Sequence, residues 1–247
     1  MKENKYDDNI FFQKYSQMSR SQQGLAGAGE WETLRKLLPD FKDKRVLDLG
    51  CGYGWHCIYA MEHGASSVVG VDISHKMLEV AKEKTHFPQV EYKCCAIEDV
   101  EFPEESFDVI LSSLAFHYVA DYEILVKKIY RILKSGGKLV FTVEHPVFTA
   151  YGTQDWYYNE KGEILHFPVD NYYYEGKRTA VFLGEKVTKF HRTLTTYLNT
   201  LLSNGFIINH IVEPQPPEYM MDIPGMQDEM RRPMMLIVSA NKNCYTT

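Results

Sequence analysis

Short apolar runs alternate along this chain with segments that have helical spacing. The runs fall at residues 45–49, 67–72, 107–113 and 137–144. After Asp121, apolar residues recur at helical intervals up to Gly136-Gly137, and we expect these positions in the core: Tyr122, Leu125, Val126, Ile129 and Leu133. Strands that alternate with helices are typical of a parallel sheet built from right-handed crossovers. The pattern therefore predicts an α/β fold.

The last third of the chain continues this pattern. A helix is expected over 193–203, where Asn204-Gly205 ends it, and strands are expected over 206–212 and 234–240. The residues between these strands include Pro216-Pro217 and Pro224-Gly225, which predict an irregular loop over 214–233. Nothing in the sequence indicates what this loop does.

A glycine-rich turn follows the first predicted strand directly. Gly50, Gly52 and Gly54 let the backbone turn sharply and approach a ligand closely, and a helix is expected from about Trp55 to Gly64. Its amino end faces the turn, so an anionic group should lie there. A tight strand-to-helix turn without a ligand is the alternative, because the glycines alone are a weak signal.

Spacing narrows the choice of ligand. Dinucleotide sites use G-x-G-x-x-G, whereas the third glycine of this chain comes one residue early. Asp72 ends the second predicted strand, eighteen residues beyond Gly54, where it can accept hydrogen bonds from both hydroxyls of a ribose. Together the turn and the acid predict an adenosine cofactor.

Three segments carry a family resemblance, and they are Leu47-Asp48-Leu49-Gly50-Cys51-Gly52, Phe102-Pro103-Glu104-Glu105-Ser106-Phe107-Asp108 and Leu133-Lys134-Ser135-Gly136-Gly137. With them the chain resembles class I S-adenosylmethionine-dependent methyltransferases, in particular small-molecule methylases of ubiquinone and menaquinone biosynthesis and an uncharacterised bacterial subgroup. The resemblance implies an enzyme that uses S-adenosyl-L-methionine and releases S-adenosyl-L-homocysteine. It also implies a Rossmann-like, seven-stranded, mostly parallel sheet with helices on both faces and the last strand antiparallel.

The same resemblance implies cofactor-binding residues. Backbone groups of Gly50 and Gly52 would meet the methionine part, and Cys51 between them is also a cofactor-binding candidate. Asp48 would orient the loop or reach the amino group through water, and Asp72 would take the ribose. Ile73 would pack on the adenine. The remaining candidates follow the third and fourth strands: Ala96, Ile97, Glu98, Ser112 and Ser113. Many relatives have an acid where this chain has Ala96. Arg20 could clamp the methionine carboxylate, with a solvated arginine as the alternative.

Methyl transfer from a sulfonium is an in-line displacement, so an enzyme has to align the reactants, exclude water and, where needed, remove a proton. The candidate general bases are His145, after the fifth strand, and His191, although a lone histidine is more often structural. His117 is a weaker candidate. The chain has neither a polar-Pro-Pro-aromatic motif after the fourth strand nor a Pro-Cys dipeptide, which disfavours methylation of nucleic-acid bases.

A length of 247 residues with 45% hydrophobic content predicts one domain. We expect four parts: N-terminal lid helices (1–40), a cofactor-binding core (41–144), a cap insertion (145–192) and a C-terminal helix and strand pair (193–247). The lid includes an amphipathic helix with Trp31, Leu34, Leu37 and Leu38 on one side. The insertion is rich in aromatic residues, namely Trp156, Tyr157, Tyr158, Phe167, Tyr172, Tyr173, Tyr174 and Phe182. These form either a wall of the substrate pocket or a small satellite core, or both.

Charge and cysteine content exclude several functions. A net charge of −6 argues against a nucleic-acid partner, and five cysteines without metal-site spacing predict reduced thiols and no bound metal. No apolar signal core and no run of eighteen apolar residues occur, so we expect a cytoplasmic protein without a membrane partner.

The leading hypothesis is a methyltransferase that acts on an oxygen, nitrogen or carbon of a small-molecule acceptor. The alternatives are a non-catalytic S-adenosylmethionine-binding protein and a nucleotide-dependent oxidoreductase, which the early third glycine disfavours. The oligomeric state is not predicted.

Overall fold

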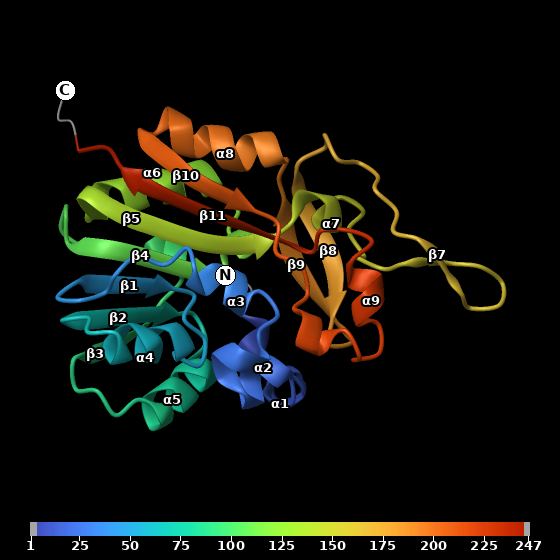
Figure 1. Ribbon diagram of the computed structural model, residues 1–247, viewed down its shortest axis with the longest axis horizontal. Coiled ribbons are helices and arrows are strands. Elements are labelled where there is room, and N and C mark those ends of the chain that lie inside the picture. The colour runs from blue at the N-terminus through green and yellow to red at the C-terminus, as the bar shows by residue number, and fades with distance from the viewer. Residues whose placement is uncertain (1–3, 245–247) are drawn as a thin grey trace.

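A seven-stranded sheet in the order β10-β11-β5-β4-β1-β2-β3 organises the computed structural model, which describes residues 4–244 (Figure 1). Its strands are β1 (Arg45–Leu49), β2 (Ser67–Asp72), β3 (Val90–Cys94), β4 (Phe107–Ser113), β5 (Leu133–Glu144), β10 (Phe206–Val212) and β11 (Met235–Lys242). Neighbouring strands pair in parallel except at β11, which runs antiparallel to both β5 and β10. The predicted seven-stranded, mostly parallel sheet with an antiparallel last strand is confirmed.

Helices cover both faces of this sheet (Figure 1). One face packs against α3 (Trp31–Arg35), α4 (Trp55–Glu62) and α5 (His75–Lys84), and the other against α6 (Tyr122–Ile132) and α8 (Leu194–Ser203). Because successive side chains of a strand point to opposite faces, Val46 belongs to the first core and Leu47 to the second. A helix layer on each face leaves the ends of the strands as the place for a ligand.

Most predicted elements have the expected bounds, with two corrections near the sheet. The helix after Asp121 ends at Ile132 rather than beyond Leu133, because Leu133 pairs with Phe107 as the first residue of β5. The apolar pattern did not indicate β3, an edge strand in which no residue is fully buried. Asp121 caps α6 as predicted, since its Oδ1 accepts a hydrogen bond from the Ile124 N–H at 2.9 Å.

The N-terminal segment (residues 4–40) lies against the carboxyl ends of the strands. It comprises η1 (Lys5–Asp7), α1 (Asn9–Ser16), α2 (Ser19–Gln22), η2 (Gly24–Gly27) and α3. Asp7 fastens it to the start of α5, because its Oδ1 accepts hydrogen bonds from Ser74 Oγ at 2.6 Å and from the Lys76 N–H at 3.1 Å. The predicted amphipathic helix is shorter than expected, and Leu37 and Leu38 follow it while still packing against the same core.

The insertion between β5 and α8 contains α7 (Pro146–Ala150) and two hairpins. The hairpins are β6 (Tyr157–Tyr158) with β7 (Ile164–His166), and β8 (Gly176–Phe182) with β9 (Glu185–His191). The loop between β10 and β11 contains η5 (Glu218–Met220) and α9 (Met226–Glu229), and η3 (Ile97–Asp99) and η4 (Phe116–Tyr118) follow β3 and β4. Across residues 4–244, none of the helices has the length and apolar character needed to cross a membrane. Residues 1–3 and 245–247 of the predicted domain lie outside the described part.

Candidate functional site

A cavity of about 960 Å³ opens at the carboxyl ends of the strands. The N-terminal segment, the β8–β9 hairpin and the loop between β10 and β11 surround it, and all three gather at that end of the sheet (Figure 1). Its volume is at the upper end of the roughly 300–1,000 Å³ that is usual for small-molecule sites. The cavity therefore has room for more than one small ligand.

The glycine turn forms the floor of one half of this cavity. Gly50 has a φ of 80°, and a Cβ added there would lie 2.4 Å from the Cβ of Ala115, so only glycine fits. The N–H groups of Gly50 and Cys51 both donate to the carbonyl oxygen of Val71, at 2.8 and 2.9 Å. The loop is thus fixed to the end of β2 with its backbone open to the cavity.

Two carboxyls lie at the turn in different surroundings. Asp72 lines the cavity and accepts hydrogen bonds from the Gly52 and Ser74 N–H groups, both at 2.9 Å, while burial raises its pKa. Asp48 lies behind the turn, where burial raises its pKa to about 7 and Cys57 Sγ contacts its Oδ2 at 3.5 Å. Within residues 4–244, Asp48 Oδ1 is buried without a hydrogen-bond partner.

A second pair of charges lies beside the turn. Arg20 Nη2 donates to Glu30 Oε1 at 2.5 Å, and both residues line the cavity as well as a smaller adjoining pocket of about 80 Å³. Glu30 Oε2 and Trp55 Nε1, also on the small pocket, are buried and have no hydrogen-bond partner in the described part of the chain. An acceptor, a donor and a guanidinium therefore surround one small space.

Most of the predicted cofactor residues meet at this half of the cavity. The residues that line it are Arg20, Gly50, Gly52, Asp72, Ile73, Ala96, Ile97, Glu98 and Ser113. Cys51 lines only the smaller pocket. Asp48 and Ser112 line neither, and Ser112 Oγ instead donates to the Leu49 carbonyl at 2.7 Å. We call this half, between the glycine turn and η3, the nucleotide half.

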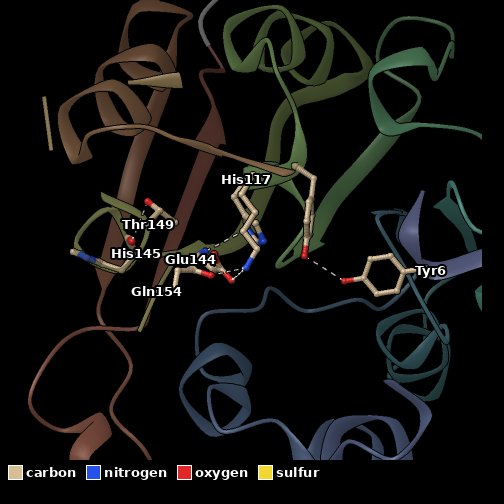
Figure 2. Close-up of polar contacts among 8 residues, drawn as sticks. Tyr6, His117, Glu144, His145, Thr149 and Gln154 are labelled. Carbon is tan, nitrogen blue, oxygen red and sulfur yellow. Dashed lines mark hydrogen bonds and ion pairs between the residues drawn. The ribbon is translucent and has the colours of Figure 1, made fainter. Parts of the chain in front are cut away.

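The distal half is lined by η4, Glu144, the β8–β9 hairpin and residues 214–235, and it contains a closed polar cluster. Lys189 Nζ donates to Glu144 Oε1 at 2.5 Å and to Gln154 Oε1 at 2.9 Å, and Gln154 Nε2 donates to Glu144 Oε2 at 2.6 Å. Burial opposes ionisation of Glu144, but His117, Lys189 and Gln154 outweigh it and hold its pKa below the usual range. Tyr6 reaches in from the N-terminal segment, with its hydroxyl 3.4 Å from that of Tyr118 (Figure 2).

His117 joins this cluster through its ring. The Glu144 N–H donates to His117 Nδ1 at 3.4 Å, and burial lowers the pKa of His117 to about 4. The ring is therefore neutral near pH 7, with its proton on Nε2. This histidine lines the cavity as a hydrogen-bond donor.

The structure does not bring His145 or His191 to the cavity wall. The side chain of His145 points away from Glu144 and His117 (Figure 2), and its Nδ1 accepts from the Val147 N–H at 3.0 Å. Its Nε2 lies 2.8 Å from Glu213 Oε1, but the angles of this contact are not those of a hydrogen bond. His191 Nδ1 is 2.7 Å from Thr149 Oγ1 and its Nε2 is 2.8 Å from the Tyr172 carbonyl. This geometry argues against the predicted roles as general bases.

The aromatic insertion also differs from the expectation. Of the eight aromatic residues named above, only Phe182 lines the cavity among the described residues, together with Phe190 of the same insertion, while Tyr173 and Tyr174 are 87% and 75% exposed. Phe182 also packs against a small separate core of Phe11, Ala180 and Val187. The predicted aromatic wall of the pocket is not confirmed. No group of three or more His, Cys, Asp or Glu side chains within residues 4–244 is arranged to hold a metal ion.

This chain is similar to several known methyltransferases. A family model described as a methyltransferase domain matches residues 47–141. A Listeria monocytogenes structure of a candidate S-adenosylmethionine-dependent methyltransferase is 58% identical, with 89% of this chain and 99% of that chain covered and a TM-score of 0.85. The structure of an S-adenosylmethionine-dependent methyltransferase from Mesorhizobium loti is 40% identical, with 89% of this chain and 100% of that chain covered and a TM-score of 0.82. A ubiquinone biosynthesis O-methyltransferase of Coxiella burnetii is 36% identical, over 44% of this chain and 47% of its own.

Proposed function

The chain belongs to the S-adenosylmethionine-dependent methyltransferases, and we propose that it methylates an oxygen, nitrogen or carbon atom of a small metabolite. S-adenosylmethionine is the cofactor of this family. When bound, it supplies a methyl group on a positively charged sulfur. The observation that carries the proposal is one cavity that has a glycine cradle at one end and ample space at the other.

The residues of the nucleotide half fit the parts of this cofactor. Asp72 has a carboxylate at the cavity for the ribose hydroxyls, and Ile73 has an apolar side chain for the adenine. Glu30, with its unpartnered buried oxygen, would take the ammonium of the methionine part. Arg20 and the unpartnered Trp55 N–H would take the carboxylate. The ammonium and the carboxylate of the methionine part would thus each face a residue of opposite charge in this small pocket.

The chain's own contribution to transfer would be alignment and the exclusion of water. We propose that residues 4–40, the described part of the expected lid, act as a lid, since Tyr6, Tyr15 and Arg20 line the cavity and Asp7 fastens the segment to α5. The distal half would hold the acceptor against the methyl group. Alignment of two bound reactants lowers the barrier to transfer without a covalent enzyme intermediate.

Isothermal titration calorimetry with S-adenosylhomocysteine, S-adenosylmethionine and NAD⁺ tests this proposal. We expect both sulfur compounds to bind and the dinucleotide not to bind. Incubation with radiolabelled S-adenosylmethionine and a small-molecule extract should then give a labelled product. Binding of the dinucleotide alone would replace the proposal with an oxidoreductase, and cofactor binding without any labelled product would favour a non-catalytic binding protein.

His191→Ala should lower stability and leave cofactor binding unchanged. The substitution removes the ring that contacts both Thr149 and the Tyr172 carbonyl, and the loss should be about 2 kcal/mol because buried polar groups lose their partners. Urea unfolding gives the stability, and calorimetry with S-adenosylhomocysteine gives the affinity. His86→Ala is the control, because His86 is exposed and should change stability by less than about 0.5 kcal/mol. A weakened cofactor affinity in His191→Ala alone would place this histidine at the site after all.

A further inference from the structure

We propose that the methyl acceptor is a small molecule with an apolar body and an anionic oxygen, which binds to Lys189 and His117 in the distal half of the cavity. This inference rests on the proposed function and specifies the substrate class. It follows from two donors in the distal half that have no partner among the described residues, from the apolar surface around them, and from the pairing of the carboxylates there.

Two donors of the polar cluster have no hydrogen-bond partner within residues 4–244. A lysine ammonium has three N–H groups, and Lys189 uses two of them, on Glu144 and Gln154, which leaves one. The neutral His117 ring accepts at Nδ1 from the Glu144 N–H, so its Nε2–H is a second donor. Both side chains line the cavity, although Lys189 is only 2% exposed and His117 is also 2% exposed. An oxygen with lone pairs would satisfy both donors.

The carboxylates of the distal half are already neutralised. Glu144 accepts from Lys189 at one oxygen and from Gln154 at the other. Glu229 is paired with Arg232, with contacts of 2.7 and 3.0 Å. Among the described residues that line this half, a cationic amine would therefore find no carboxylate that is not already paired. Lys177 lines the cavity as well, at its exposed side, and has a positive charge that no ion pair in the described part of the chain neutralises.

Apolar side chains also line this half, among them Phe182, Val187, Met220, Met226, Met234 and Met235. Methionine side chains adapt their shape to a ligand and pack well against rings. Buried donors beside such a surface favour a molecule with an apolar body and one polar end. The apolar body of the ligand would bury surface against these side chains, and the donors of Lys189 and His117 would fix the position of its oxygen.

Calorimetry with four probes of similar size tests the inference. The probes are 4-nitrobenzoate, 4-nitrophenol at a pH where it is ionised, nitrobenzene and 4-nitrobenzylammonium, each titrated into the chain saturated with S-adenosylhomocysteine. We expect at least one anion to bind about tenfold tighter than nitrobenzene, as one charged hydrogen bond would give. The two anions distinguish a carboxylate from a phenolate. Tighter binding of the neutral or cationic probe, or no measurable binding of any probe, would overturn the inference.

A double variant and a matched control locate the effect. Glu144→Gln with Lys189→Met removes both buried charges at once, so the net charge is unchanged, and we expect the preference for anions to disappear. Lys177→Met removes one positive charge from the cavity and should keep most of the preference. The reverse result would show that general electrostatics, rather than Lys189, selects anions, and would contradict the proposal. The probe series on the unmodified chain decides the question even if the double variant does not fold.

The failure of the inference and that of the proposed function are distinguishable in the same samples. A chain that binds S-adenosylhomocysteine but shows no preference for anions keeps its function and loses the proposed substrate class. A chain that does not bind S-adenosylhomocysteine loses both.

Discussion

Asp72→Ala should weaken the binding of S-adenosylhomocysteine by about a hundredfold or more. The Asp72 carboxylate lines the cavity, and we propose that it accepts hydrogen bonds from both ribose hydroxyls. Two hydrogen bonds to a charged group contribute about 1.5–3 kcal/mol each, so their joint loss corresponds to at least two orders of magnitude. The substitution also removes the acceptor that holds the Gly52 N–H at 2.9 Å, which should loosen the glycine turn. Calorimetric titration measures the change.

Two further variants separate these effects. Asp72→Asn keeps an oxygen for the Gly52 N–H and removes the charge, so its affinity should lie between those of the wild type and Asp72→Ala. Asp108→Ala is the matched control, because Asp108 also accepts from a backbone N–H, that of Arg45, and from a lysine, Lys134. Asp108 lies at the start of β4, at the opposite end of the sheet from the glycine turn. Equal losses of affinity in Asp72→Ala and Asp108→Ala would mean that Asp72 acts through the fold alone.

The core strands and helices were predictable because burial imposes a strong pattern on them. β1, β2 and β4 have the predicted bounds, and each consists largely of apolar residues, as strands covered on both faces do. The edge strand β3 has only half-buried and exposed residues, and its run Val90-Glu91-Tyr92-Lys93-Cys94 resembles a surface segment. The two-residue β6 is too short for any periodicity. Pairing with a neighbour, which a single sequence does not reveal, defines these elements.

The two halves of the cavity also differ in how far the sequence predicts them. The residues of the nucleotide half cluster at the ends of consecutive strands, so a local motif identifies them. Glu144, Gln154 and Lys189 are separated by 10 and 35 positions and meet only in the folded chain. Sequence analysis selected His145 rather than Glu144 at the end of β5. Glu144 is the last residue of β5 and His145 continues it with extended backbone, so the two side chains point in opposite directions and only one of them could reach the cavity. The acid at the end of an apolar strand was the available signal.

Lys189→Met should lower the free energy of unfolding by about 3–5 kcal/mol at pH 7, because it leaves the buried Glu144 carboxylate without its partner. The Lys189 side chain is 3% exposed and that of Glu144 is 13% exposed, so solvent screens this pair little. The Glu144→Gln, Lys189→Met double variant should recover much of the loss, since no single charge remains buried. Urea unfolding of the wild type, both single variants and the double variant gives the coupling energy of the pair.

The loss in Lys189→Met should also depend on pH. In the wild type the pKa of Glu144 is lowered, so its contribution to stability is present above the unfolded value of about 4.3 and is lost only as the pH falls through the folded pKa. Without Lys189, burial dominates and the pKa rises, so the folded variant gains a proton, shared with the neighbouring His117, as the pH falls from 7 towards 5. Its unfolding free energy should therefore increase relative to that of the wild type over this range, while the double variant stays parallel to the wild type. A constant difference between Lys189→Met and the wild type from pH 7 to 5 would mean that Glu144 remains ionised through its contacts with His117 and Gln154, and that Lys189 contributes packing rather than charge.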